Sequence, residues 1–265
     1  MAPARPDDPD PSAMPGYGPS SYGDGFADVY DDWYADVSPP AATAAFVAAR
    51  TSGPVLELGS GTGRLAGPLR DAGVAVVGLD ASTAMLGRSV ARHPAVPVVA
   101  ADMADLPVRD GCLGGVLVAF NTLFNLPSAA EQRRCLTRAR QALAPGGVVV
   151  VEAFVPGSGA EAATDRVDVV RLEADLVVLR VSRTDPARQT VAGHHVELRD
   201  GAPVRLRPWQ LHFRGTAELD RMAEVAGLRL SERYEGWDGE PFDDASGTHV
   251  SVYRAAEGPS LVSGQ

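Results

Sequence analysis

The stretch Val55-Leu-Glu-Leu-Gly-Ser-Gly-Thr-Gly-Arg-Leu-Ala66 carries the strongest structural signal in the chain. Its first four residues form a short, mostly apolar run that predicts a buried β-strand. Glycines at alternate positions, Gly59, Gly61 and Gly63, allow a sharp turn and leave no Cβ between the backbone and a ligand. A helical pattern follows, and the first amide groups of such a helix point towards the turn. The stretch therefore predicts a site for a nucleotide-like ligand at the carboxyl edge of a parallel sheet.

The residues after this turn alternate between apolar runs and helical patterns. Strands are expected over 55–58, 74–80, 96–101, 114–120 and 148–154, with helices over 63–72, 82–93 and 128–143. This βαβ spacing predicts an α/β fold with a doubly wound, mostly parallel sheet. A helix over 216–226 and two strands over 228–234 and 249–253 should complete a seven-stranded sheet, with the last two strands forming an antiparallel hairpin.

Residues 159–213 interrupt the βαβ pattern. Four β-rich runs, over 167–172, 176–182, 191–198 and 204–213, are separated by turn residues rather than helices, so they should pair antiparallel. We therefore expect an inserted antiparallel β lid between two parts of one core. The expected division is a disordered tail over 1–24, the first part of the core over 25–158, the lid over 159–213, the C-terminal part of the core over 214–256, and a flexible tail over 257–265.

A segment over 26–35 places aromatic side chains at helical spacing. Phe26, Tyr30, Trp33 and Tyr34 share one stripe of the expected helix. The stripe has two interpretations, because it can fill part of the core or cap a ligand pocket.

Composition excludes several classes of function. The net charge of −10, from 24 basic and 34 acidic residues, argues against nucleic acid as a partner. The chain contains no lysine, which excludes Schiff-base chemistry and a phosphate-loop lysine. Cys112 and Cys135 form no Cys-x-x-Cys pair, no His-Glu-x-x-His pair occurs, and no metal site is expected. No secretory signal or membrane-spanning run is seen, so we expect a cytoplasmic protein with reduced thiols.

Four motifs at the ends of the expected strands resemble those of class I S-adenosylmethionine-dependent methyltransferases. Glu57-x-Gly59-x-Gly61-x-Gly63 resembles the first motif, Asp80 ends the second strand, and Asp102-Met103 follows the third. Phe120-Asn121 resembles the fourth motif, and the resemblance covers residues 26–255. It implies a Rossmann-like methyltransferase fold with S-adenosylmethionine as cofactor. The cofactor-binding residues that it implies are Tyr30, Glu57, Gly59, Ser60, Gly61, Gly63, Asp80, Ala81, Met85, Asp102, Met103, Phe120 and Asn121.

Two alternatives remain open at this stage. A dinucleotide fingerprint can be placed on Gly61-x-Gly63-x-x-Ala66, which would indicate an NAD-dependent oxidoreductase. A protein that binds S-adenosylmethionine without transferring its methyl group, as a regulator, would show the same motifs.

The resemblance implies methyl transfer to nitrogen or oxygen of a small, polar metabolite, because similar insertions occur in relatives that methylate glycine or the amino group of deoxysugars. The lid and the 26–35 segment should form the wall of the acceptor pocket, with Tyr22, Tyr30 and Tyr34 placed to close over the cofactor. No residue is a firm catalytic assignment. Candidates are His195, His212, Asn125 and Tyr30, since an imidazole can take a proton near neutral pH. A monomer or a homodimer is expected.

Overall fold

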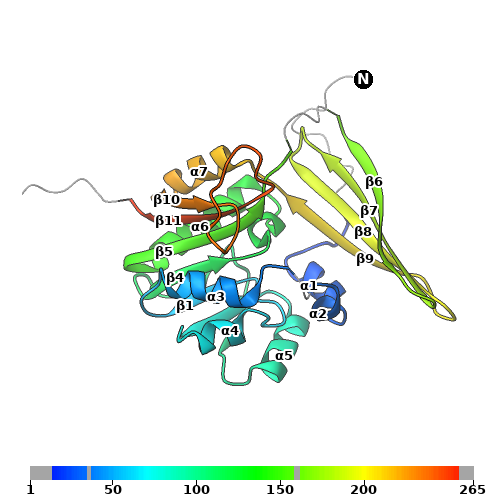
Figure 1. Cartoon of the computed structure of the whole chain (residues 1–265), viewed down its shortest axis with the longest axis horizontal. Helices are drawn as coiled ribbons and strands as arrows, with labels where there is room; N and C mark the ends of the chain where they lie inside the picture. Colours follow the sequence, from blue (N-terminus) through cyan, green and yellow to red (C-terminus); the bar gives the residue numbers. More distant parts are fainter. Residues whose placement is uncertain (1–13, 35–36, 158–161, 257–265) are drawn as a thin grey trace, which may run out of the picture.

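The computed structural model describes residues 14–34, 37–157 and 162–256, and these residues form two β-sheets with helices around the larger one (Figure 1). Sheet A has seven strands in the order β10-β11-β5-β4-β1-β2-β3. Their bounds are Val55–Leu58 for β1, Val76–Asp80 for β2, Val98–Ala100 for β3, Leu113–Val118 for β4, Leu143–Phe154 for β5, Leu228–Tyr234 for β10 and Thr248–Ala255 for β11. The first five strands run parallel, and β11 pairs antiparallel with both β5 and β10. The predicted fold class is confirmed.

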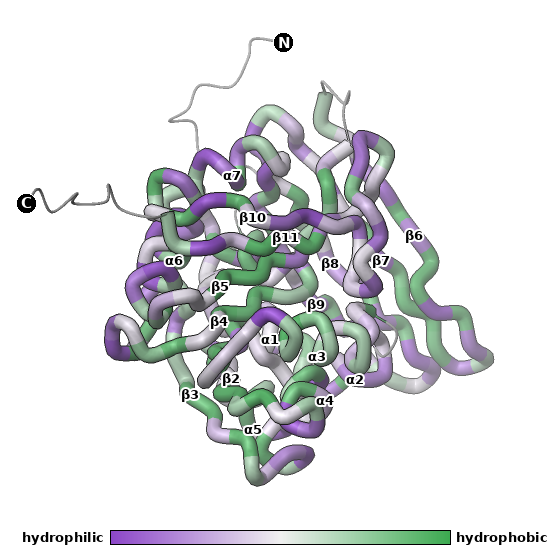
Figure 2. The backbone as a smooth tube through the Cα atoms, turned by 60° about the vertical axis from the view of Figure 1, so that its left-hand side comes forward, coloured by the Kyte–Doolittle hydropathy of each residue, from purple (hydrophilic) through white to green (hydrophobic). Residues whose placement is uncertain are grey.

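Helices cover both faces of sheet A. Helices α3 (Pro40–Ala48) and α4 (Ala66–Asp71) share one apolar core with Val148 and Val150 of β5. Helices α6 (Ala129–Ala142) and α7 (Thr216–Val225) share the other core with Val149 and Val151. Because successive side chains of a strand point to opposite faces, a fully apolar strand supplies both cores at once. Figure 2 shows hydrophobic residues concentrated along β4 and β5.

The helix after the glycine turn is shorter than predicted. It begins at Ala66 rather than at residue 63. The backbone of Gly63 has a φ of 77°, which a right-handed helix does not allow, so the turn takes up residues assigned to the helix. Helix α5 (Thr83–Arg92) follows β2 as expected, and the hydroxyl of its N-cap residue, Ser82, accepts a hydrogen bond from the amide of Met85.

Sheet B is the predicted insertion between β5 and α7. Its strands pair antiparallel in the order β6-β7-β8-β9, and they project beyond sheet A (Figure 1). The strand bounds are Thr164–Leu172 for β6, Leu176–Asp185 for β7, Thr190–Arg199 for β8 and Arg205–His212 for β9.

The N-terminal segment, residues 14–34, departs from both predictions made for it. Helix α1 (Ser21–Phe26) lies partly in the expected disordered tail, and the expected 26–35 helix is interrupted before α2 (Tyr30–Trp33). Tyr22 stacks on Phe26 with ring centroids 4.6 Å apart, and burial of such rings offsets the entropy of ordering the chain. The prediction of disorder is therefore wrong for residues 14–24. Residues 1–13 and the predicted tail over 257–265 lie outside the described residues.

A buried histidine in β11 should make stability depend on pH. His249 is fully buried, its Nδ1 lies 2.9 Å from the hydroxyl of Ser251, and its Nε2 has no partner. Burial, reinforced by Arg233 and opposed by Asp220, lowers its pKa from 6.5 to about 4. The unfolded chain therefore binds a proton that the folded chain excludes, so stability is retained above pH 6.5 and lost as pH falls towards 4.

We expect the contribution of His249 to the free energy of unfolding to fall by about 2 kcal/mol between pH 7.5 and pH 5. Urea unfolding at the two pH values, for the wild type and for His249→Leu, measures this difference. The variant should lose that part of the pH dependence. An equal pH dependence in both proteins would contradict the assignment.

Candidate active site

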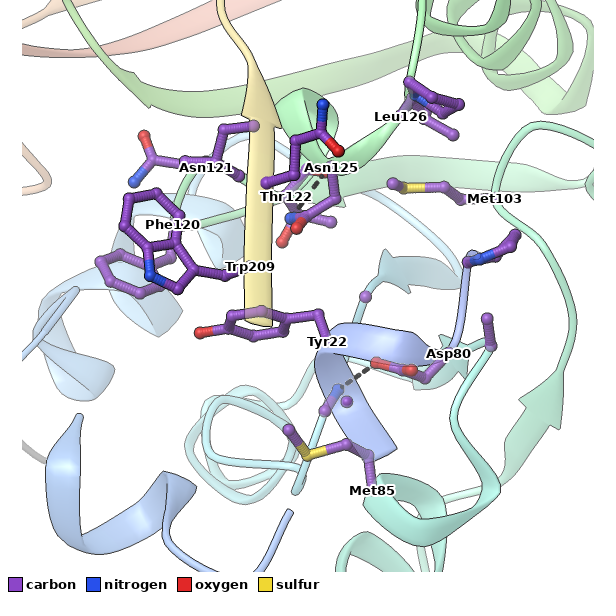
Figure 3. A pocket seen from close by; sticks show the side chains of 18 of the residues that line it. Tyr22, Asp80, Met85, Met103, Phe120, Asn121, Thr122, Asn125, Leu126 and Trp209 are labelled. Carbon is purple, nitrogen blue, oxygen red and sulfur yellow. Dashed lines mark hydrogen bonds between the residues drawn. The ribbon is translucent and has the colours of Figure 1, made fainter. Parts of the chain in front are cut away.

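One large cavity lies where sheet A, sheet B and the N-terminal segment meet. Its volume is about 480 Å³, within the range of small-molecule sites. The carboxyl ends of β1, β2 and β4 line one side, and the 3₁₀ helix η1 (Thr122–Asn125) and strands β7 to β9 line the other. Figure 3 shows side chains from these elements converging on the cavity.

Most of the predicted cofactor residues line this cavity. They are Tyr30, Gly59, Gly61, Asp80, Ala81, Met85, Asp102, Met103, Phe120 and Asn121. The four candidate catalytic residues, His195, His212, Asn125 and Tyr30, line it as well. The structure thus brings both groups of residues to one place.

Asp80 and the glycine turn form a connected rim. One carboxylate oxygen of Asp80 accepts the Gly61 amide at 2.9 Å, shown as a dashed line in Figure 3. The other accepts the Ser82 amide at 2.8 Å. Gly59 and Gly61 have φ values of 62° and 56°, in the left-handed region that favours glycine. Burial raises the pKa of Asp80, while the amide hydrogen bonds oppose that rise. The rim presents bare peptide groups beside a carboxylate.

Three predicted cofactor residues lie behind the turn and do not line the cavity. The hydroxyl of Ser60 faces Gly78, where an added Cβ would lie 2.7 Å from it. An added Cβ on Gly63 would lie 2.5 Å from the hydroxyl of Ser89. Glu57 is buried with one carboxylate oxygen unpaired, and burial raises its pKa to about 8. These residues shape the turn from behind.

The end of β4 holds two consecutive non-glycine residues with positive φ, 45° at Phe120 and 60° at Asn121. Such backbone is strained and persists only where the surroundings enforce it. The Phe120 amide donates to the Glu152 carboxylate at 2.6 Å, and the Asn121 amide donates to the Glu152 carbonyl at 3.0 Å. The Asn121 side-chain oxygen accepts the Phe154 amide at 2.7 Å. Strand β5 thereby fixes this corner of the cavity.

Glu152 is a site residue that sequence reasoning missed. Besides the Phe120 amide, its carboxylate accepts the hydroxyl of Ser38 at 2.7 Å and the indole N–H of Trp237 at 2.7 Å. The available signal was a single charged residue within the apolar 148–154 run. A buried strand rarely carries a carboxylate unless that group has partners.

Asp102 serves the local turn while it lines the cavity. One of its carboxylate oxygens accepts the Ala104 amide at 2.8 Å. This bond uses one oxygen of the carboxylate, so the capping role and a ligand contact through the other oxygen are compatible.

Four buried polar atoms on the cavity wall have no hydrogen-bond partner among the residues that the structure describes. They are the hydroxyl of Tyr17, the side-chain oxygen of Asn125, Nδ1 of His195 and the indole nitrogen of Trp209. Buried polar groups are nearly always paired, so a group left unpaired on a cavity wall indicates a ligand. Sequence reasoning missed Tyr17 and Trp209, because only the fold brings the N-terminal segment and β9 to the cavity.

The four groups are electrically neutral. Burial raises the pKa of Tyr17 to about 12, against an opposing effect of the nearby Gln210 backbone, so its hydroxyl stays protonated. Burial, followed by the charges of Arg180 and Arg207, lowers the pKa of His195 to about 4, so its ring is neutral at physiological pH. Arg180 also lines the cavity, but its guanidinium is paired with Asp168 at 2.8 Å. These four groups can therefore donate and accept hydrogen bonds without carrying charge, and the carboxylate of Glu131, which also lines the cavity, accepts the hydroxyl of Ser128 at 3.2 Å.

The comparisons with known proteins agree with this geometry. A family model described as "Methyltransferase domain" matches residues 55–147, which contain the glycine turn, Asp80, Asp102 and Phe120. The CcbJ methyltransferase from Streptomyces caelestis is 43% identical in sequence. The match covers 91% of this chain and 100% of that protein, with a TM-score of 0.85. The chain belongs to the class I S-adenosylmethionine-dependent methyltransferases.

Two further similar proteins are named for different methyl acceptors. CalS10 from Micromonospora echinaspora, an amino pentose methyltransferase solved with S-adenosylmethionine bound, shares the fold with a TM-score of 0.59 at 23% identity, over 91% of this chain and 93% of that protein. The cypemycin N-terminal methyltransferase from a Streptomyces species is 29% identical over 84% of this chain and 93% of its own length. S-adenosylmethionine is the cofactor that membership of this family implies.

Several demethylmenaquinone methyltransferases also match, but four of them only over 40% to 47% of their own lengths. These matches therefore support the methyltransferase domain without fixing the acceptor. Family membership favours the methyltransferase over the NAD-dependent oxidoreductase and over a non-catalytic binding protein.

Two further observations concern the residues that the structure describes. None of their helices combines the length and apolar character needed to cross a membrane. Within the same ranges, no group of three or more His, Cys, Asp or Glu side chains is placed to hold a metal ion.

Proposed function

We propose that this enzyme transfers the methyl group of S-adenosylmethionine to a nitrogen or oxygen atom of a small, polar metabolite. The observation that carries the proposal is the division of the cavity into two walls. One wall presents bare peptide groups and the Asp80 carboxylate, and the other presents four neutral, unpaired polar groups. Two separate sets of binding groups in one cavity fit two ligands that must meet.

The first wall fits the cofactor. The glycine turn gives the ligand access to main-chain amides, and Asp80 can accept hydrogen bonds from ribose hydroxyls. Asp102 is placed to accept from the adenine amino group, and Phe120 and Asn121 lie where the methionine end would bind. We assign Glu57, Ser60 and Gly63 to support of the turn. When bound, the cofactor supplies a methyl group that its sulfonium already activates.

The protein's own contribution is to position the acceptor and exclude water. Orienting two reactants can lower a barrier by about 7–11 kcal/mol. Tyr22, Tyr30 and Tyr34 of the N-terminal segment line the cavity, and burial raises the pKa of each. They remain neutral and form a largely apolar cover. His195, neutral and unpaired at Nδ1, can accept a hydrogen bond from an N–H or O–H of the acceptor.

We also propose which kind of partner the enzyme binds, where it is located and how its chain is divided. The net charge of −10 supports a small-molecule partner rather than nucleic acid. Free Cys112 and Cys135 suit a cytoplasmic location, and we propose a monomer or homodimer. Within the chain, we assign 25–158 and 214–256 to the cofactor-binding core and 159–213 to acceptor binding.

The direct test is to identify the methylated product. Purified enzyme is incubated with methyl-labelled S-adenosylmethionine and a metabolite extract, and mass spectrometry finds which compound gains the label. A labelled amine or alcohol of low molecular weight is the expected result. Label found only on carbon, or only on protein or nucleic acid, would contradict the proposal.

Removing single hydrogen-bonding groups from the second wall should weaken acceptor binding alone. Tyr17→Phe deletes one hydroxyl, and Trp209→Phe deletes one indole N–H together with part of the ring. Each variant should raise the KM for the identified acceptor about 3- to 10-fold, the value of one hydrogen bond. Calorimetry should find unchanged affinity for S-adenosylhomocysteine. Tyr234→Phe, which removes a hydroxyl bonded to Arg50 and Glu232 outside the cavity, is the matched control. If these variants bound S-adenosylhomocysteine more weakly and kept the wild-type KM for the acceptor, the division into two walls would be refuted.

A further inference from the structure

The N-terminal segment lies between the core and sheet B, and its acidic side chains bind to both (Figure 1). Towards the core, Asp24 accepts the hydroxyl of Ser82 at 2.6 Å, and Asp31 accepts the hydroxyl of Thr62 at 2.5 Å. Towards sheet B, Asp28 pairs with Arg207 on β9. The segment supplies part of the cavity wall, so its attachment on both sides determines whether that wall is in place.

Two arginines of β9 attach the segment to sheet B: the exposed Arg205, which pairs with Asp28 at 2.6 Å, and the buried Arg207, which makes more of the contacts. The side chain of Arg207 is 1% exposed. Its two terminal nitrogens donate to the Asp28 carboxylate at 2.6 and 3.1 Å, and one of them also donates to the carbonyl of Gly25 at 2.5 Å. The guanidinium carbon lies 5.3 Å from the ring centroid of Trp33 in α2. All of these contacts reach across from sheet B to the N-terminal segment.

Only one partner of Arg207 belongs to its own sheet. Glu197 on β8 accepts from the guanidinium at 2.8 Å. A buried charge is costly unless every donor is satisfied, and Glu197 alone leaves donors unpaired. The charge of Arg207 is therefore fully compensated only when Asp28 and the Gly25 carbonyl are docked against it. Arg207 and Asp28 do not line the cavity themselves.

We propose that Arg207 is a positioning residue, which holds Tyr22 and Tyr30 in the cavity wall through Asp28 and the Gly25 carbonyl and thereby strengthens cofactor binding. The inference rests on the proposed function of the cavity. Its consequence is that the affinity for the cofactor depends on an ion pair outside the cofactor site, because only the docked segment completes the wall.

The test measures binding of S-adenosylhomocysteine by calorimetry. Asp28→Ala and Arg207→Met should each raise its Kd about tenfold, because the docked state is no longer the dominant one. The double variant should be no weaker than the weaker single variant, since both changes break the same contact. Glu197→Gln is the matched control. It removes the other carboxylate from the same guanidinium within sheet B, and its Kd should stay within about twofold of the wild type.

Hydrogen exchange gives a readout that is independent of ligand and of activity. In the cofactor-free protein, amides of α1 and α2 should exchange faster in Asp28→Ala than in the wild type, while those of β1 and β4 stay unchanged. Arg207→Lys should recover only part of the affinity, because an ammonium cannot reproduce the fork of contacts.

Each failure has a separate meaning. Wild-type Kd and wild-type exchange in Asp28→Ala would overturn the positioning role. Asp28 is 41% exposed, so this variant decides the question if Arg207→Met does not fold. An equal loss of affinity in Glu197→Gln would also overturn it, since the effect would then belong to sheet B alone. Failure of the wild type to bind S-adenosylhomocysteine would instead refute the proposed function.

Discussion

Replacing Asp80 by alanine is expected to weaken binding of S-adenosylhomocysteine about 100-fold. The reason is that the ribose hydroxyls of the ligand lose two hydrogen bonds to a charged carboxylate. The carboxylate is the only side chain that joins the Gly61 amide to the Ser82 amide in the described rim. Its loss therefore removes the partner of the ribose hydroxyls and loosens the turn that approaches the cofactor. Isothermal calorimetry measures the affinity directly.

Two further variants separate charge from shape. Asp80→Asn keeps the size of the side chain but not its charge, and it should lose nearly as much affinity as the alanine variant. Asp105→Ala removes an exposed carboxylate paired with Arg134 outside the cavity and should bind normally. Binding of NADH by the wild type, or wild-type affinity in Asp80→Ala, would exclude the assignment of this rim to the methyl donor.

Replacing Glu152 by alanine should lower the free energy of unfolding by about 3–5 kcal/mol and abolish methyl transfer. The Phe120 amide and the Trp237 indole N–H would both lose a buried partner. The backbone at Phe120 and Asn121 would also lose part of the support for its positive φ values. Urea unfolding followed by circular dichroism measures the first effect, and product formation measures the second.

A pair of milder substitutions tests the reason for this loss. In Glu152→Gln, the amide NH₂ would face the indole N–H of Trp237, donor against donor. Adding Trp237→Phe removes that conflict, so the double variant should be more stable than the sum of the single changes predicts. Strict additivity would show that the two side chains do not depend on each other.

The sequence predicted the fold well because its strands are buried on both faces. Runs such as 114–120 are apolar throughout, and their spacing leaves room for crossover helices. Positions at strand ends were also predictable, since parallel strands bring their carboxyl ends to one edge. Asp80 and Asp102 were predicted in this way, and both line the cavity. The ordered structure of the N-terminal segment was not predicted, because it depends on tertiary aromatic contacts that composition does not show.

The sequence named His195 and Asn125 on the second wall of the cavity but not Tyr17 or Trp209, and it gave no firm reason to choose His195. His194 and His195 are adjacent, and neither residue type nor spacing tells which one faces the cavity. The pairing of β8 with β7 and β9 decides which histidine faces the cavity. His195 lies opposite Arg180 and Arg207, whereas His194 lies opposite Val181 and Pro208. Glu152 was hidden for a related reason, since its partners Ser38 and Trp237 are distant in sequence.

The placement of sheet B has a consequence for how such an enzyme diversifies. Strands β6 to β9 form one uninterrupted stretch, 164–212, which leaves sheet A after β5 and returns at α7. Two of the four groups we assign to the acceptor, His195 and Trp209, lie on this stretch, while the glycine turn and Asp80 are encoded far upstream. Recombination of a single gene fragment can therefore change half of the acceptor wall and leave the methyl-donor rim intact, provided that the incoming fragment keeps a counterpart of Arg207.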